Sequence, residues 1–150
     1  MRKLVNLAFI YMLVGVASGL FYREFSKINE FPEGGYTQLS IVHTHLLVLG
    51  FLVFLLVLLL ERAFTLSQHR KLYAWFLGTY NAGLILTASM MTAHGMLTII
   101  GVESNKMISG IAGLGHMFLT AGMILLFIML RRSVGARRSD SSQKLDAASN

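Results

Sequence analysis

The sequence contains no cysteine, one proline and few charged residues, and these scarcities exclude whole classes of protein. Without cysteine there is no disulfide, zinc ribbon, iron–sulfur cluster, thiol catalyst or haem attached through Cys-x-x-Cys-His. Charged residues make up 13% of the 150 residues and hydrophobic residues 55%, against about 25% and about 45–50% in soluble domains. Since so little charge cannot cover a soluble fold of this size, we predict a membrane protein.

Four long apolar runs dominate the chain, and none has Asp, Glu, Lys or Arg inside its apolar stretch. Each reaches the roughly 20 residues that an α-helix needs to cross the hydrocarbon core. An isolated strand could not satisfy its backbone hydrogen bonds in lipid. Short connections make consecutive helices antiparallel neighbours. We therefore predict one all-α domain over residues 1–130, a four-helix up-down bundle in the lipid bilayer with helices at about 4–22, 39–60, 73–100 and 107–130.

Residues 131–150 follow the last run and are polar and rich in serine and arginine. This composition buries too little apolar surface to fold alone and predicts a disordered tail. The first run has some features of a secretory signal peptide, with a basic start and small residues near Ala17. Its length and its continuation into an aromatic, charged segment favour a retained transmembrane helix.

Lysine and arginine are distributed unevenly between the two predicted membrane faces, ten on one and three on the other. Because these residues collect on the cytoplasmic side, both termini are predicted to be cytoplasmic. The net charge of +6 therefore reflects topology rather than a basic stripe, and we expect no nucleic-acid partner. The ten are Arg2, Lys3, Arg62, Arg70, Lys71, Arg131, Arg132, Arg137, Arg138 and Lys144, and the three are Arg23, Lys27 and Lys106.

Four of the five histidines, His43, His45, His94 and His116, lie inside these runs. Ionisable residues within a membrane are rare and mark candidate functional sites. At about 1.5 Å per residue, all four fall in the outer half of the membrane. A single intramembrane histidine is more often a hydrogen-bonded packing residue than a ligand. The fifth, His69, falls in a cytoplasmic connection.

The pair His43 and His45 gives the stronger signal, because two imidazoles buried without strong partners would each cost several kcal/mol. Residues two apart diverge by about 200° around a regular α-helix. The two rings therefore cannot ligate one small ion from the same helix. If each histidine serves a site on its own flank of the helix, every helix of this kind contacts two sites. This suggests a ring of subunits.

His94 and His116 allow a second interpretation, because several methionines crowd the outer halves of the same two helices. Methionine usually fills gaps or faces lipid, but beside histidine it could form a path for a soft metal such as copper. The methionines in question are Met90, Met91, Met96, Met107 and Met117.

The stretch SIVHTHLLVLGF, residues 40–51, resembles the His-x-His segments of the haem–copper oxidase superfamily. In subunit I of those enzymes one helix carries two histidines, two apart, that ligate different haems, and the helices form three pseudo-symmetric groups of four. The chain looks like one such group. It is more similar still to small bacterial four-helix proteins of unknown function that are labelled cytochrome-c-oxidase-subunit-I-like. The likeness is carried by SGLFYREF (18–25), TQLSIVHTHLLVLG (37–50) and AGLGHMFL (112–119).

The resemblance implies a homotrimer in a bacterial plasma (inner) membrane, with haem b at each subunit interface. His43 of one protomer and His45 of its neighbour would be the axial ligands. Arg23 would bind the outward-facing propionates, and His94 and His116 would contact a haem edge or hold an extra metal. The electron donor would be a membrane quinol or a separate redox protein.

The chain also departs from that family. No second histidine adjoins His94, which is followed by Gly95, and no glutamate lies within a predicted span. A full oxygen-reducing centre is therefore not evident, and enzymatic activity stays an open question. Two axial histidines would suit electron transfer. Three hypotheses remain: a b-type haem protein in electron transfer or in handling or sensing a small redox molecule, a copper- or metal-handling membrane protein using His94 and His116, and a structural subunit of a larger complex.

Overall fold

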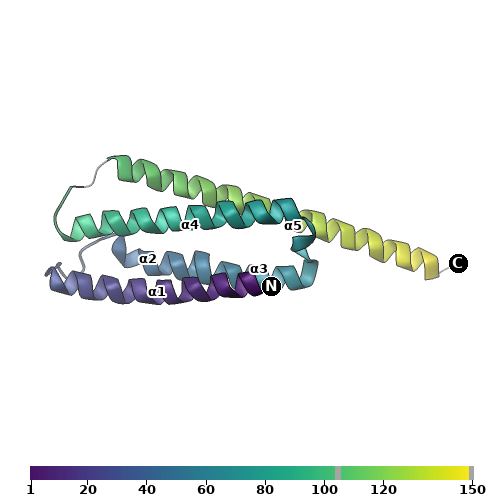
Figure 1. The fold of residues 1–150 in the computed structure, drawn as a ribbon, viewed down its shortest axis with the longest axis horizontal. Helices are drawn as coiled ribbons and strands as arrows, with labels where there is room; N and C mark the ends of the chain where they lie inside the picture. Colours follow the sequence, from purple (N-terminus) through teal and green to yellow (C-terminus); the bar gives the residue numbers. More distant parts are fainter. Residues whose placement is uncertain (104–105, 149–150) are drawn as a thin grey trace.

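The computed structural model describes the backbone of residues 1–103 and 106–148, and the side chains of residues 1–103 and 110–135. Its long helical segments run up and down in chain order (Figure 1). No strand occurs in the described residues, which confirms the all-α, four-helix prediction. The elements are α1 (Arg2–Ile28), α2 (Leu39–His45), the π-helical segment η1 (Leu46–Leu52), α3 (Val53–Phe64), the 3₁₀ turn η2 (Leu66–Gln68), α4 (Arg70–Ile99) and α5 (Lys106–Ala148).

Four helical segments are long and apolar enough to cross a membrane. Many of their large apolar side chains are exposed in the single protomer, among them Phe9, Leu52 and Phe127. Apolar surface on this scale indicates contact with lipid or with other subunits rather than with water. The protein therefore has the architecture of a multi-pass membrane protein, with candidate spans Arg2–Ile28, Leu39–Phe64, Arg70–Ile99 and Gly110–Gly135.

α1 and α5 extend furthest beyond their predicted ends. α1 continues to Ile28, because its last residues include no Gly or Pro and the break comes only near Pro32. α5 continues through Ala148 and projects past the other helices in Figure 1, whereas the sequence predicts a disordered tail from residue 131. The tail has no proline, and its four arginines and three alanines are compatible with a helix.

Glycines let the helices approach closely in two pairs. Gly83 and Gly115 bring α4 against α5, because a Cβ atom on Gly83 would lie 2.5 Å from the backbone N of Leu119. Gly15 brings α1 against η1, because a Cβ there would lie 2.8 Å from Leu47. Small residues at such contacts are typical of membrane helices. α4 lies between α5 and the α2–α3 segment and contacts both.

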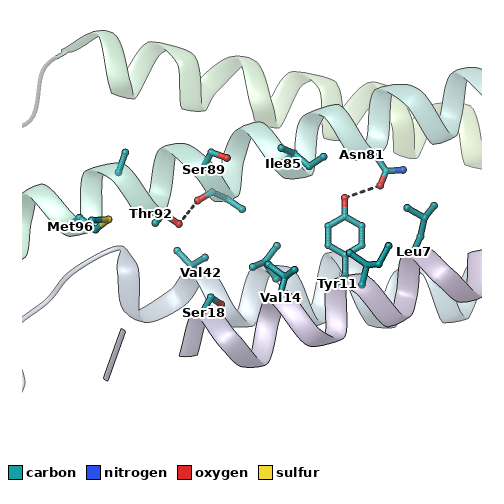
Figure 2. A pocket seen from close by; sticks show the side chains of 14 residues that line it. Leu7, Tyr11, Val14, Ser18, Val42, Asn81, Ile85, Ser89, Thr92 and Met96 are labelled. Carbon is teal, nitrogen blue, oxygen red and sulfur yellow. Dashed lines mark hydrogen bonds between the residues drawn. The ribbon is translucent and has the colours of Figure 1, made fainter. Parts of the chain in front are cut away.

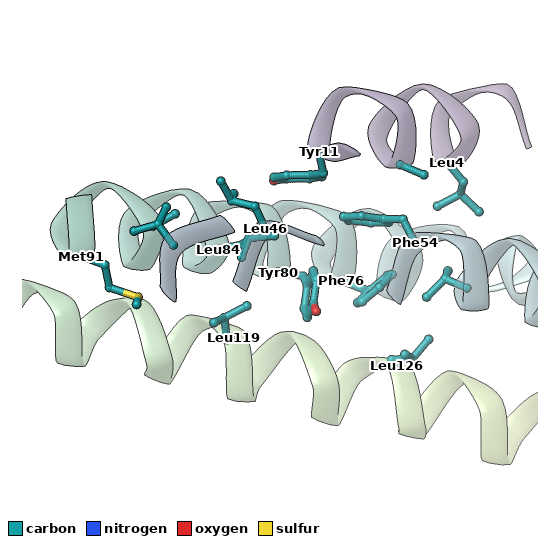
Figure 3. Close-up of a cluster of buried hydrophobic side chains, with 14 of the residues drawn as sticks. Leu4, Tyr11, Leu46, Phe54, Phe76, Tyr80, Leu84, Met91, Leu119 and Leu126 are labelled. Atoms are coloured by element: carbon teal, nitrogen blue, oxygen red, sulfur yellow. The ribbon is translucent and has the colours of Figure 1, made fainter. Parts of the chain in front are cut away.

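An aromatic cluster joins three of these helices (Figure 3). Tyr11 of α1 stacks on Phe54 of α3, with ring centroids 5.7 Å apart. Tyr80 of α4 contacts Phe54 edge-on at 5.6 Å and lies the same distance from Phe76. Aromatic pairs of this kind favour one arrangement of the helices. The cluster fixes the half of the bundle away from the intramembrane histidines.

Candidate functional site

His43 lies on α2 and faces α1. A Cβ atom on Gly19 of α1 would lie 3.6 Å from the Cβ and Cγ atoms of His43, which is ordinary contact. The Nδ1 atom of His43 is shielded from solvent and has no hydrogen-bond partner. Its Nε2 atom lies 3.3 Å from Thr44 Oγ1, at the long end for a hydrogen bond. His43 is therefore a half-buried imidazole with unfilled bonding capacity.

His45 has one ring nitrogen held in a hydrogen bond. Its Nδ1 atom lies 3.1 Å from the carbonyl oxygen of Ile41, and since a carbonyl can only accept, Nδ1 must carry the proton and donate it. The lone pair then resides on Nε2. Histidines that bind metal through one ring nitrogen commonly donate the other N–H to a backbone carbonyl in this way. His45 thus has the tautomer of an Nε2 ligand.

The two histidines lie on opposite flanks of α2. The segment Leu39–His45 is a regular α-helix, so side chains two residues apart point about 200° away from each other. His43 points toward α1, and His45 therefore points away from it. Among the described residues no three His, Cys, Asp or Glu side chains come close enough together to hold a metal ion. Within one protomer the imidazole rings of His43 and His45 therefore face different neighbours.

Arg23 lies one turn beyond Gly19 on α1. Residues four apart share a helix face, so Arg23 follows the contact with His43 by about 6 Å toward the C-terminal end of α1. Its side chain is 75% exposed, and Nε lies 3.5 Å from Glu24 Oε1. An exposed ion pair of this kind is weak. The guanidinium can leave it for a more strongly charged group beside His43.

His94 and His116 lie on α4 and α5. The Nδ1 atom of half-buried His94 is shielded and has no hydrogen-bond partner. His116 is exposed, and its Nδ1 lies 3.0 Å from the carbonyl oxygen of Ala112, which leaves the Nε2 lone pair free. Its neighbour Met117 is 67% exposed, while the side chain of Met107 lies outside the described residues. The structure places no histidine trio together in this part of the chain.

The π-helical segment η1 begins directly after His45 and was not predicted from the sequence, which gave an uninterrupted helix. Gly50 admits the ring of Tyr11, since a Cβ on Gly50 would lie 2.5 Å from Tyr11 Cγ. Tyr80 donates a hydrogen bond to the carbonyl oxygen of Leu49 at 2.9 Å. Because π turns are wider than α turns, the side chains after η1 point in other directions relative to the histidines than they would on a regular α-helix. Such segments occur frequently at functional sites.

A groove of about 620 Å³ runs between α1 and α4 and is floored by α2 and η1 (Figure 2). Tyr11 donates a hydrogen bond to Asn81 Oδ1 at 2.7 Å near one end. Ser18, Ser89 and Thr92 are among the few other polar side chains in a mainly apolar lining. The sequence marks Asn81 as a candidate polar contact, because it is an amide inside an apolar run. Nothing in the sequence marks Tyr11 as its partner, because the two residues are 70 positions apart.

Comparison with known proteins gives a family but no activity. A family described as "Protein of unknown function (DUF2871)" matches residues 1–133. The chain belongs to this family. No curated protein and no solved structure matches the chain. The matched residues of the DUF2871 member include all four intramembrane histidines and Arg23, so its function has to be argued from these residues.

Proposed function

We propose that the protein is a b-type haem protein of the bacterial plasma membrane, with both termini in the cytoplasm. It would assemble as a homotrimer and would act in electron transfer or in handling or sensing a small redox molecule. The resemblance of the His-Thr-His segment to haem–copper oxidase subunit I supports this assignment. The excess of Lys and Arg at the termini and the second connection supports the orientation.

The observation that carries the proposal is the placement of His43 and His45 on opposite flanks of α2. One protomer cannot direct both rings at one iron from this helix. A closed ring of subunits lets His43 of one protomer face His45 of the next at every interface. The exposed apolar surface of the protomer provides area for such contacts.

The donor set fits a haem. His45 offers the Nε2 lone pair while its Nδ1 is held by Ile41, and His43 can offer Nε2, which makes only a long contact of 3.3 Å with Thr44 Oγ1. Arg23, one turn outward on the His43-facing side of α1, would bind a propionate. Bound haem would supply one-electron redox chemistry, and two histidine ligands favour electron transfer. The residues themselves would position the group, and the donor would be a quinol or a separate redox protein.

One observation favours a second candidate function, the handling of copper. His116 has a free Nε2 atom on an exposed face of α5, next to the exposed thioether of Met117. Imidazole with thioether suits a soft ion such as Cu(I). This candidate predicts stoichiometric copper that is lost with His116 and is indifferent to His43.

The deciding experiment is an ultraviolet–visible spectrum of the detergent-purified protein, oxidised and dithionite-reduced. We expect a Soret band, split α and β bands on reduction, and about one haem per protomer. His43→Ala and His45→Ala should each remove most of the haem, because each replaces one of the two ligands that would hold it. His69→Ala, in the cytoplasmic connection, is the matched control and should keep the spectrum.

A colourless protein from haem-sufficient cells would refute the haem assignment. Metal analysis of the same sample then tests the copper candidate, with His116→Ala as its variant. A full haem content in both His43→Ala and His45→Ala would also refute the assignment of the ligands.

A further inference from the structure

An open hollow of about 330 Å³ lies at the turn between α3 and α4, beside α5. It is lined by Gln68, His69, Arg70, Lys71, Leu72 and Arg132. We propose that this hollow binds the phosphate group of an anionic phospholipid. The proposal is independent of haem, and it concerns the end of the bundle opposite His43 and His45.

Three permanent cations converge on the hollow from two elements, Arg70 and Lys71 from the start of α4 and Arg132 from α5. The ion pair found among the described side chains, Arg23 with Glu24, lies at the other end of the bundle. These three cations are therefore without a carboxylate partner in the described part of the chain. A phosphate oxygen would satisfy them by charge-assisted hydrogen bonds.

The nearby carboxylate is already used. Glu61 is 8% exposed and accepts hydrogen bonds from the backbone N–H of Ser67 at 2.9 Å and from its hydroxyl. These bonds tie the end of α3 to η2. Glu61 therefore shapes the turn and does not neutralise the hollow.

Neutral hydrogen-bond donors also lie at the hollow. No side chain caps the N-terminus of α4, so N–H groups of its first turn remain free and the helix dipole favours negative charge there. His69 lines the hollow, and its Nε2 atom is shielded from solvent without a hydrogen-bond partner. The free N–H groups are independent of the cations and suit the same anionic group.

The hollow is built on fixed elements. Gln68 donates a hydrogen bond to the hydroxyl of Ser133 at 3.1 Å, which joins η2 to α5 next to Arg132. Leu66 in η2 is fully buried. The cations on the two helices are thus held near each other before any ligand binds, which lowers the entropy cost of binding.

The position at the membrane surface favours a lipid over a soluble phosphate. The hollow lies at the ends of candidate spans Arg70–Ile99 and Gly110–Gly135, on the face where Lys and Arg are concentrated. Basic pockets between transmembrane helices on that side bind anionic headgroups. A lipid there is also present at high local concentration.

Trp75 provides a built-in probe, because it is the single tryptophan, lies 67% exposed and follows Arg70 by little more than one turn. The full chain is reconstituted in phosphatidylcholine vesicles, and Trp75 fluorescence is quenched with increasing brominated phosphatidylglycerol or brominated phosphatidylcholine. We expect the anionic lipid to reach half-maximal quenching at about tenfold lower mole fraction.

Arg132→Gln should lower this preference severalfold, because Arg70 and Lys71 remain, and Arg132→Lys should restore part of it. Arg131→Gln is the matched control, since it removes the same charge from the adjacent residue, which does not line the hollow. Thermal unfolding of each variant checks that the bundle stays intact. Equal losses at residues 131 and 132 would mean diffuse surface attraction and would overturn the proposal. So would equal quenching by both lipids, or displacement of the lipid by millimolar inorganic phosphate.

Discussion

At the scale of single residues, the hydrogen bond between Tyr11 and Asn81 links α1 to α4 beside the groove (Figure 2). Asn81 also donates to the carbonyl oxygen of Leu77, so its amide is held in one orientation. Because Tyr11 is only 6% exposed, loss of its hydroxyl leaves Asn81 Oδ1 without this donor. Side-chain hydrogen bonds between membrane helices contribute about 0.6 kcal/mol on average and up to about 1.7 kcal/mol.

We therefore predict a coupling free energy of about 0.5–1.5 kcal/mol between these residues. Tyr11→Phe, Asn81→Leu and the double variant complete a double-mutant cycle, measured by reversible unfolding in mixed micelles. Tyr36→Phe is the control for loss of a tyrosine hydroxyl, since Tyr36 is 75% exposed. Strictly additive single effects would show that the bond does not stabilise the bundle.

The residues of the candidate site were partly accessible from the sequence. Ionisable side chains stand out in apolar runs, so all four intramembrane histidines could be named, and helical geometry separates His43 from His45. The ring nitrogen that each offers could not be predicted. It depends on the carbonyl of Ile41 for His45 and, for His43, on the burial of Nδ1, which leaves Nε2 as the accessible nitrogen.

At the scale of helices, the close contact between α4 and α5 depends on glycine. A Cβ on Gly83 would lie 2.5 Å from the N atom of Leu119 and 2.8 Å from the O atom of Gly115, both backbone atoms that cannot turn aside. We predict that Gly83→Ala destabilises the protein by about 1–3 kcal/mol, as overpacking does. Gly113→Ala on α5, where nothing lies within 4 Å, should be neutral or slightly stabilising. Unfolding in mixed micelles measures both, and equal effects would contradict this packing.

The existence of each helix was predictable because an apolar run longer than a membrane span has few alternatives in lipid. The π-helical segment was not predictable. Gly50 alone does not require it, and the contacts that accompany it come from Tyr11 on α1 and Tyr80 on α4. A local pattern cannot encode a register change that accompanies contacts with two other helices.

At the scale of the whole molecule, the protomer leaves much of its apolar surface uncovered, and its two central histidines face different sides of α2. A sequence shows which residues are apolar but not whether lipid or a second copy covers them. The proposed trimer is therefore best tested by a property that only the assembly has. A haem shared by two protomers can be rebuilt from two variants that are each defective.

We predict such complementation when His43→Ala and His45→Ala protomers are co-expressed in equal amounts with different affinity tags. An interface keeps both ligands only if the protomer giving His43 is the His45→Ala variant and its neighbour is the His43→Ala variant. With random mixing in a closed ring each condition holds half of the time, so about one quarter of the sites should be intact. Tandem purification removes the homomeric trimers and leaves one intact site in three, about one third of the wild-type Soret absorbance. The Soret absorbance of wild-type trimer, purified through one affinity tag, is the reference for full haem occupancy. If haem sat within one protomer, the mixed trimers would stay as deficient as each variant alone, and the interfacial site would be refuted even in a haem-binding protein.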